Sequence, residues 1–336
     1  MTNLSRRSFV RLSGLAALAL TGRLARPPEA LAARLTRGQQ ILRRSRLLMG
    51  TYVTITVIDP SLTRAEEAVE NTFAEIVRLE RILSRYQASG PLTHLNTTGR
   101  LAHPDPELVA VLSAARSYHD LSGGAFDATV APVVDALKAH FERDGGPPPR
   151  AELAALLKRV DGGAVEVSTG EIRLLKEGLA LTLDGLAKGY IVDLAVQKLA
   201  FFGIEGALIN AGGDIRALGQ KGRAPWRVAV LDPTQAHRKG PIIDLADESI
   251  ATSGNYEVFY DTEKLHHHII DPASGRSPIS LVSVSVRAAS CLVADALSTT
   301  IFCLAPRQGL GLLDRLGASG LIIDRAGHRL SRGAWG

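Results

Sequence analysis

The chain is poor in cysteine, with only Cys291 and Cys303 among its 336 residues. Two thiols permit at most one disulfide in an oxidising compartment. Cys303 lies in the apolar run Ile301-Phe302-Cys303-Leu304, which is typical of a buried helix. Two inert buried thiols are therefore at least as good an interpretation as a bridge.

Long apolar runs are also missing. The stretch from Leu12 to Leu20 is too short to cross a bilayer, for which about 20 residues are needed. No later stretch reaches about 18 apolar residues, so we expect the mature protein to be soluble and not membrane-spanning. No cysteine follows the apolar stretch, which excludes a lipoprotein anchor.

The sequence has no basic stripe, although its formal net charge is +5. Residues 1–32 contain five of the 39 basic residues and one of the 34 acidic residues, so the remainder carries about +1. A nucleic-acid-binding protein would need a clustered basic surface. We therefore expect no nucleic-acid partner.

The first residues have the pattern of an export signal. Ser5-Arg6-Arg7-Ser8-Phe9-Val10-Arg11 is a twin-arginine motif, and Ala30-Leu31-Ala32 offers a small-x-small cleavage site. The alternative is an ordinary N-terminal anchor. We predict a signal peptide over 1–32, a basic and polar tether over 33–46, one folded unit over 47–336, and export to the periplasm.

Helical and strand patterns follow one another without a regular βαβ rhythm, which favours an α+β fold with mixed sheets and flanking helices. No internal repeat or extended low-complexity tract is present. Helices are predicted at 63–84, 108–121, 130–140, 151–157 and 188–202, and strands at 52–58, 164–167, 171–175, 179–183, 206–210, 226–231, 242–245, 249–251 and 282–286.

The most informative residues lie near the C-terminal end. Asp295 and Thr299 are four residues apart in a predicted helix, so they share one face. A carboxylate and a hydroxyl are hard oxygen ligands, suited to Mg²⁺ or Ca²⁺. Upstream, His268 precedes the turn-forming Asp271-Pro272, which suggests proton transfer beside a phosphate.

Asp184-Gly185-Leu186-Ala187-Lys188-Gly189-Tyr190 joins a predicted strand to a predicted helix. The first turn of a helix offers free N–H groups and a positive dipole end, and Lys188 adds a full charge, so the segment suits a phosphate. It is neither a Walker motif nor a GxGxxG fingerprint. A plain strand-turn-helix connection with a solvated lysine is the alternative.

Three further loops are rich in glycine or polar residues. In Ser122 to Val130 the glycines permit close approach of a ligand, and Asp127 is a candidate acceptor for a ring N–H or an amine. Asp127 could equally cap the helix predicted at 130–140. Asn210 to Asp214 and Thr252 to Tyr256 could line a pocket, or be generic turns.

His266, His267 and His268 form a run, and on a strand the first and third would share a face. No cysteine or third spaced histidine completes a zinc site, so zinc is disfavoured. We expect one histidine of the run to act as a base and the other two to lie on the surface.

Taken together, these segments resemble the ApbE family of FAD:protein FMN transferases. The resemblance runs from Met49-Gly50-Thr51 to Thr299 in one consistent order. The other segments that carry it are Ser84 to Tyr86 leading to Leu95-Asn96, Gly124 to Asp127, Asp184 to Tyr190, Asn210 to Asp214, Ser253 to Tyr256, His268 to Pro272 and Ala294-Asp295.

The resemblance implies an ApbE-like fold and a Mg²⁺-dependent transfer of FMN from FAD to a threonine of a target flavoprotein, with release of AMP. It implies catalytic roles for His268, as the base, and Asp271. Magnesium would be held by the side chains of Asp295 and Thr299 and the carbonyl of Gly185. FAD would be held by Met49, Tyr86, Ala125, Phe126, Asp127, Asp184, Lys188 and Ile270, with Tyr86 stacked on the flavin and Lys188 at the phosphates.

The match is not complete. The family often has an acidic residue between Tyr86 and Leu95, which is absent here. Asn255 stands where an aspartate is usual, and Ser274 where threonine is usual. These departures affect contacts at the edge of the flavin and remove no proposed metal ligand.

Two other functions remain open from the sequence. An FAD pyrophosphatase would use the same metal site with water in place of threonine, giving FMN and AMP. A periplasmic FAD-binding accessory protein without turnover is the third possibility. For the transferase, the expected partner is a membrane respiratory flavoprotein, by family analogy.

Overall fold

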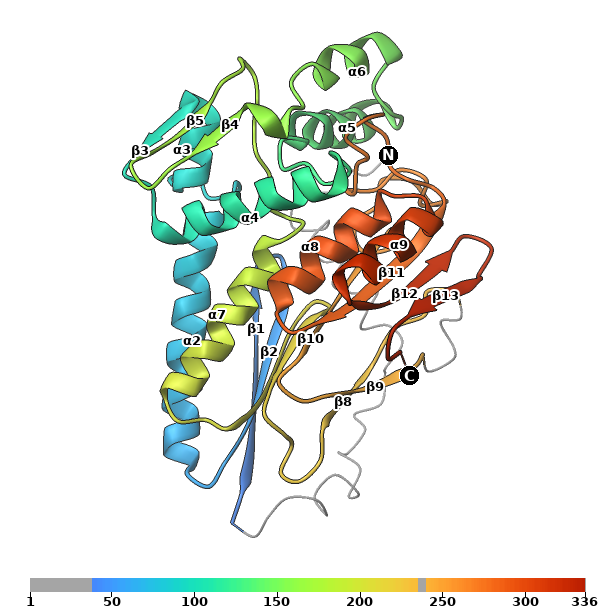
Figure 1. The fold of residues 1–336 in the computed structure, drawn as a ribbon. Coiled ribbons are helices and arrows are strands. Elements are labelled where there is room, and N and C mark those ends of the chain that lie inside the picture. Colours follow the sequence, from blue (N-terminus) through green and yellow to red (C-terminus); the bar gives the residue numbers. More distant parts are fainter. Residues whose placement is uncertain (1–37, 235–239, 336) are drawn as a thin grey trace.

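The computed structural model describes residues 38–234 and 240–335 and is built on a large antiparallel sheet (Figure 1). The predicted signal peptide over 1–32 lies outside the described residues. The strands of the sheet, in spatial order, are β1 (Gln40–Leu48), β2 (Thr51–Asp59), β6 (Gly206–Ala211), β7 (Asp214–Leu218), β10 (Ser249–Gly254), β11 (Leu281–Ala288), β12 (Ser319–Asp324) and β13 (Arg329–Arg332).

One face of this sheet is covered by helices. Val53, Ile55 and Val57 alternate along β2 and point into the main core on this face, where α2 and α7 lie side by side (Figure 1). Farther along, α8 packs on β10 and β11, and α9 packs beside α8. The bounds are α2 (Leu62–Leu83), α7 (Ala187–Phe201), α8 (Cys291–Phe302) and α9 (Pro306–Leu316).

The opposite face is partly covered by a two-stranded ribbon, β8 (Trp226–Ala229) and β9 (Ile242–Leu245). Ile58 and Leu208, which alternate with the residues of the main core, join Trp226 there in a separate apolar cluster. The pleat therefore sends each strand's side chains to two different cores.

A smaller unit carries the glycine-rich loop above one end of the large sheet (Figure 1). It contains a three-stranded sheet in the order β3, β5, β4. Its elements are α3 (Pro91–Thr98), β3 (Arg100–Ala102), α4 (Pro106–Ser122), α5 (Ala131–Asp144), α6 (Arg150–Leu157), η2 (Gly162–Ala164), β4 (Val165–Val167) and β5 (Glu171–Leu174).

Helices α7 and α8 cross in direct backbone contact at Gly189. A Cβ atom there would lie 2.4 Å from the carbonyl oxygen of Cys291, so only glycine fits. The Gly189 N–H donates to Oδ2 of Asp295 at 3.0 Å. From α7, Asp193 accepts the N–H groups of Cys291 and Leu292 at 2.8 and 3.0 Å, which satisfies the free donors at the start of α8.

The prediction of a tether over 33–46 is wrong for residues 40–46. They belong to β1, which pairs with β2 from Gln40↔Asp59 to Leu48↔Thr51. The basic, polar composition that indicated a tether arises because β1 is an edge strand with a mostly exposed surface. Arg44 and Arg46 pair with Glu66 and Glu70 on α2.

The predicted strand at 179–183 is also wrong. The predicted alternation of buried side chains is present, since Leu179, Leu181 and Leu183 are all buried. The segment forms only an isolated parallel bridge, Val130↔Ala180, and the Thr182 N–H donates to the Ala128 carbonyl at 2.7 Å. At Leu181 the side-chain amide of Asn96 donates to the carbonyl at 2.9 Å and accepts the N–H at 2.8 Å, so a side chain completes the pairing there.

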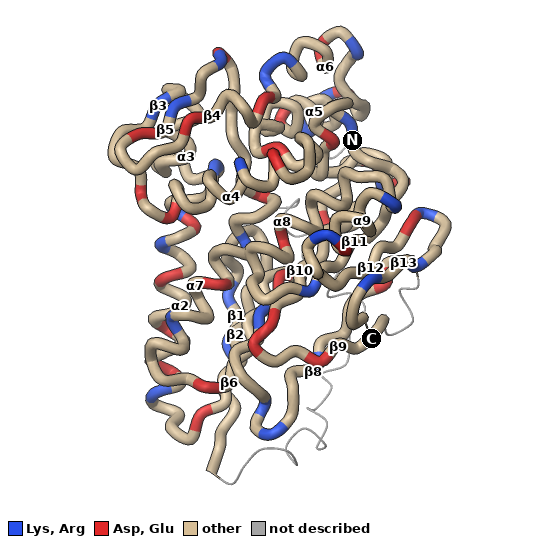
Figure 2. The backbone as a smooth tube through the Cα atoms, in the orientation of Figure 1, with Lys and Arg blue, Asp and Glu red and all other residues tan. Residues whose placement is uncertain are grey.

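The remaining predicted helices and strands are present with ends shifted by a few residues, and the α+β class is confirmed. Besides β1, the described residues contain seven elements that were not predicted: α3, β3, η2, β7, α9, β12 and β13. No helix in the part of the chain that the structure describes is long and apolar enough to span a membrane. Basic and acidic residues are intermixed along the chain (Figure 2).

The crossing of α7 and α8 makes a prediction about stability. Gly189→Ala should lower the free energy of unfolding by about 3 kcal/mol, because the new methyl group meets backbone that cannot turn aside. Urea denaturation measures this. The matched control is Gly311→Ala in α9, where a Cβ meets nothing within 4 Å and helix propensity should raise stability by about 0.5–1 kcal/mol. Equal effects of the two changes would contradict the role assigned to the crossing.

Candidate active site

Lys188 lies in the first turn of α7, as predicted, and its Nζ pairs with Oδ2 of Asp214 at 2.6 Å. Asp214 follows the β6–β7 turn and is 1% exposed. Burial disfavours the charge of Lys188, but neighbouring carboxylates, Asp214 first, outweigh it and raise the pKa of the ammonium. The site therefore has a fixed positive charge at the helix start.

Asp295, Thr299 and Gly185 are brought together at the α7–α8 crossing. Asp295 is 3% exposed and accepts the Gly189 N–H. A Cβ on Gly185 would lie 3.0 Å from Cγ2 and 3.3 Å from Oγ1 of Thr299, so the backbone of residue 185 passes close to that hydroxyl. Ser253 Oγ lies 3.1 Å from Thr299 Oγ1. The predicted spacing on one helical face is confirmed.

These oxygens fit a hard divalent cation. Burial and the charge of Asp214 raise the pKa of Asp295, so a cation would relieve an unfavourable buried carboxylate. No group of three His, Cys, Asp or Glu side chains able to hold a metal occurs within the described ranges. A single carboxylate with a hydroxyl and a carbonyl suits Mg²⁺, which is commonly bound by one or two carboxylates plus substrate phosphates and water.

His268 has the tautomer of a base. Its Nδ1 lies 3.1 Å from the carbonyl oxygen of Val258, and since a carbonyl only accepts, Nδ1 carries the proton. Nε2 then carries the unprotonated lone pair. Burial lowers the pKa of His268, and the charge of Lys188 lowers it further. The ring is therefore neutral near pH 7, with Nε2 unprotonated.

The other two histidines of the run have structural roles. His266 pairs with Asp261 through Nδ1 at 3.1 Å. His267 is fully buried, with Nε2 3.0 Å from the carbonyl of Pro278, so the prediction that it lies on the surface is wrong. The mutual bonds between its backbone and Ser277 hold it inside. The three rings serve different partners, and zinc receives no support from their arrangement.

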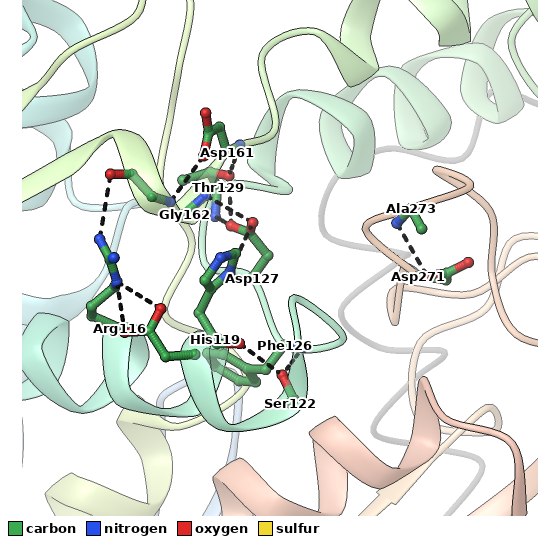
Figure 3. Close-up of polar contacts among 12 residues, drawn as sticks. Arg116, His119, Ser122, Phe126, Asp127, Thr129, Asp161, Gly162, Asp271 and Ala273 are labelled. Atoms are coloured by element: carbon green, nitrogen blue, oxygen red, sulfur yellow. Dashed lines mark hydrogen bonds and ion pairs between the residues drawn. The ribbon is translucent and has the colours of Figure 1, made fainter. Parts of the chain in front are cut away.

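Asp271 supports the turn that follows His268. Its carboxylate accepts the Ala273 N–H at 3.1 Å (Figure 3, right) and the Ser274 hydroxyl at 2.6 Å. Both oxygens are thus engaged locally, and the catalytic role of Asp271 stays a prediction. The adjacent Ile270 is buried, and its carbonyl lies 3.5 Å from the thiol sulfur of Cys303.

Asp127 is the centre of a buried hydrogen-bond cluster (Figure 3). Oδ1 accepts the N–H and hydroxyl of Thr129 at 2.7 and 2.6 Å, and Oδ2 accepts the Gly162 N–H at 2.8 Å. Oδ2 also lies 3.3 Å from Nδ1 of His119. The alternative that Asp127 caps α5 is wrong, because the residue before that helix is Val130 and makes no side-chain cap.

This cluster shapes the glycine-rich loop for a ligand. Ser122 accepts the Phe126 N–H at 3.0 Å, and the buried ring of Phe126 would lie 3.1 Å from a Cβ on Gly185. The loop therefore packs against the backbone at Gly185 through the Phe126 ring. Ala125 is partly exposed beside it. Since the carboxylate of Asp127 is already satisfied, its predicted contact with FAD would have to come from the backbone.

Two further predicted FAD residues differ in their surroundings, since Tyr86 is exposed and Met49 packs against the main core. Tyr86 is 67% exposed, and its hydroxyl is 3.4 Å from Oδ2 of Asp184, the residue before Gly185. Met49 and Gly50 form the β1–β2 turn with φ of 52° and 73°. Positive φ at both positions is what a type I′ turn requires, and methionine there is strained. Such strain is common at functional sites, which supports a role for Met49.

Several contributors were missed or unspecified by sequence reasoning. The polar loops at 210–214 and 252–256 do reach the site, through Asp214 and Ser253. Glu257 had no local signal, yet burial raises its pKa to about 7 beside Lys188 and Asp214. Arg85 adjoins Tyr86 and was likewise not singled out. Cys291 and Cys303 are both free thiols, so the disulfide alternative is wrong.

Comparison with known proteins gives a consistent picture. A family model described as "ApbE family" matches residues 49–322. The FAD:protein FMN transferase of Treponema pallidum (strain Nichols) is 31% identical over 318 residues, which cover 84% of this chain and 88% of that protein. The ApbE protein of Thermotoga maritima MSB8 has a TM-score of 0.79 and 28% identity over 87% of this chain and 96% of its own. The flavin transferase ApbE from Vibrio cholerae has a TM-score of 0.78 and 27% identity over 88% and 97%.

The Lys188–Asp214 pair predicts a pH-dependent change in stability. Lys188→Met leaves a buried carboxylate without its partner, so the free energy of unfolding near pH 8 should fall by about 3 kcal/mol. Burial raises the pKa of Asp214 above its unfolded value, so its penalty grows as pH rises and shrinks as the carboxyl is protonated. Denaturation at about pH 5 should therefore show a smaller loss. The exposed Lys138→Met is the control, and a loss independent of pH would contradict the assignment.

Proposed function

The chain belongs to the ApbE family, and on that premise we propose that it transfers FMN from FAD to a protein acceptor. Its relatives named FAD:protein FMN transferase are transferases, and the protein is an enzyme of that class. FAD is thus its proposed substrate. We further propose that the acceptor is a threonine hydroxyl, that Mg²⁺ is required and that AMP is released.

One observation carries the proposal. Lys188 directly precedes Gly189, whose N–H donates to the Asp295 carboxylate at 3.0 Å. Nδ1 of His268 is bound to the Val258 carbonyl, which leaves Nε2 to accept a proton, and the charge of Lys188 lowers the pKa of this histidine. Proton removal, charge neutralisation and oxygen ligands for a cation are therefore concentrated in one place. This is the set that phosphoryl-type transfer needs.

In the proposed reaction the hydroxyl oxygen of the acceptor threonine attacks the FMN phosphorus of FAD. A new O–P bond forms, the bond from that phosphorus to the bridging oxygen breaks, and AMP leaves with the bridging oxygen. Nε2 of His268 takes the hydroxyl proton, because a neutral hydroxyl is a poor nucleophile. The Val258 carbonyl holds the resulting imidazolium in place through Nδ1.

Charge at the pyrophosphate is balanced by groups at the α7–α8 crossing. Lys188, held by Asp214, presents its positive charge without needing to reorganise. Gly185, Asp295 and Thr299 would hold Mg²⁺, which supplies further positive charge to the phosphate oxygens when bound. Tyr86 and Met49 would meet the flavin end.

We also propose that the protein acts in the periplasm after export by the twin-arginine route, with a membrane respiratory flavoprotein as acceptor. The Arg6-Arg7 motif supports export by this route. The acceptor follows from family analogy alone.

The deciding experiment is mass spectrometry of the mature protein mixed with FAD, Mg²⁺ and a candidate target domain that contains an acceptor threonine. A mass gain on the target equal to bound FMN, lost without Mg²⁺, is the expected result. Free FMN and AMP with an unmodified target would favour the FAD pyrophosphatase. Intact FAD would favour a binding protein without turnover.

In the same assay, Asp295→Ala should abolish Mg²⁺-dependent turnover while FAD binding partly survives, because the buried carboxylate faces the proposed cation and not the flavin. Fluorescence quenching of bound FAD measures the second quantity. Unchanged transfer would remove Asp295 from the metal site.

His268→Gln should reduce transfer at least about a hundredfold and leave FAD binding intact, because only proton removal is lost. Since burial lowers the pKa of His268, wild-type kcat/KM should stay on its plateau below the ordinary histidine range and fall only in more acidic buffer. That acid limb should disappear from the residual rate of the variant. A persistent limb would assign the base to another group.

A further inference from the structure

Arg85 is an almost buried cation behind the exposed Tyr86 ring. Its side chain is 8% exposed, whereas its partner Asp135 on α5 is 59% exposed. Two parallel hydrogen bonds of 2.8 and 2.7 Å join the guanidinium to the carboxylate, the geometry in which arginine binds most specifically. Arg85 is therefore fixed in position, although it lies on a connection between α2 and α3.

The contacts of Arg85 determine how Tyr86 is oriented. A guanidinium can only donate, so the Tyr86 hydroxyl accepts from it at 3.2 Å and turns its own proton toward Asp184 at 3.4 Å. The guanidinium carbon also stands 4.8 Å from the centroid of the Tyr86 ring, within cation–π range. One ring face is thus covered by a cation, while the side chain as a whole stays exposed.

Helix α5 connects this arrangement to the loop that contains His268. Besides Asp135, it contributes Phe141, whose ring stacks on Tyr260 at 5.7 Å and contacts His266 at 5.0 Å. Tyr260 and His266 precede His268 in the same loop, and the Tyr260 N–H donates to the His266 carbonyl at 2.8 Å. Helix α5 therefore contacts both Arg85, which adjoins Tyr86, and the loop that leads to His268.

We propose that Arg85, anchored by Asp135, is a positioning residue that holds Tyr86 as a fixed wall for the planar ring of the flavin. This inference rests on the proposed function, in which the flavin end of FAD meets Tyr86. It concerns the ring system alone. Arg85 acts through Tyr86 and contributes nothing to recognition of the adenylate end.

The test compares the two halves of FAD as separate probes on the full mature protein, without acceptor. Arg85→Lys keeps the charge but loses the two parallel hydrogen bonds to Asp135. Riboflavin affinity should therefore fall about tenfold while AMP affinity is unchanged. Asp135→Asn, at an exposed position, should weaken riboflavin by a smaller factor. Arg173→Lys, in an exposed pair with Glu166, is the control and should change neither.

A double-mutant cycle separates positioning from direct contact. In a Tyr86→Ala background, Arg85→Lys should have no further effect on riboflavin, since the residue it acts through is gone. An additive loss in that background, an equal loss for AMP, or unchanged riboflavin affinity in both Arg85→Lys and Asp135→Asn would overturn the inference. If the unaltered protein bound neither riboflavin nor FAD, the proposed function itself would fail, which distinguishes the two outcomes.

Discussion

The direct contact of α7 with α8 at Gly189 is the constraint on which the site depends. Because no side chain separates the helices there, Asp295 can accept a hydrogen bond from the first turn of α7, and Lys188 projects from that same turn. Asp193, one turn later, fixes the start of α8. The close contact of the two backbones at Gly189 thus positions the Lys188 ammonium, the Asp295 carboxylate and the Thr299 hydroxyl.

Local patterns were sufficient for most elements because burial and periodicity coincide in them. They failed where contacts with distant parts of the chain decided whether a segment became a strand. Residues 40–46 look like a tether in composition, yet they form an edge strand that buries only Leu42 and otherwise meets solvent and salt bridges. At 179–183 the alternation was correct, but Asn96 supplied the hydrogen bonds that a strand would have given. Neither outcome is encoded in the segment itself.

The site was predictable where spacing alone fixes geometry, as with Asp295 and Thr299 on one helical face. The role of a site residue was not predictable where it depends on hydrogen-bond partners far away in the sequence. Asp127 looked available for a ligand, but its oxygens are used by Thr129 and Gly162. The run of three histidines gave no hint that His267 is buried, because that depends on Phe302 and Ser277 from other elements.

The spatial order of the large sheet has a consequence for how the molecule forms. β2 pairs with β6, about 150 residues later in the chain, and β6 and β7 lie between β2 and β10. Such distant pairings must be closed before the central strands are stable, which makes folding slow compared with a protein of local contacts. During synthesis, a growing chain that has not yet reached α8 lacks Asp295 and Thr299 altogether. The proposed metal site is therefore completed only when α8 has been made, long after the residues proposed for the flavin end.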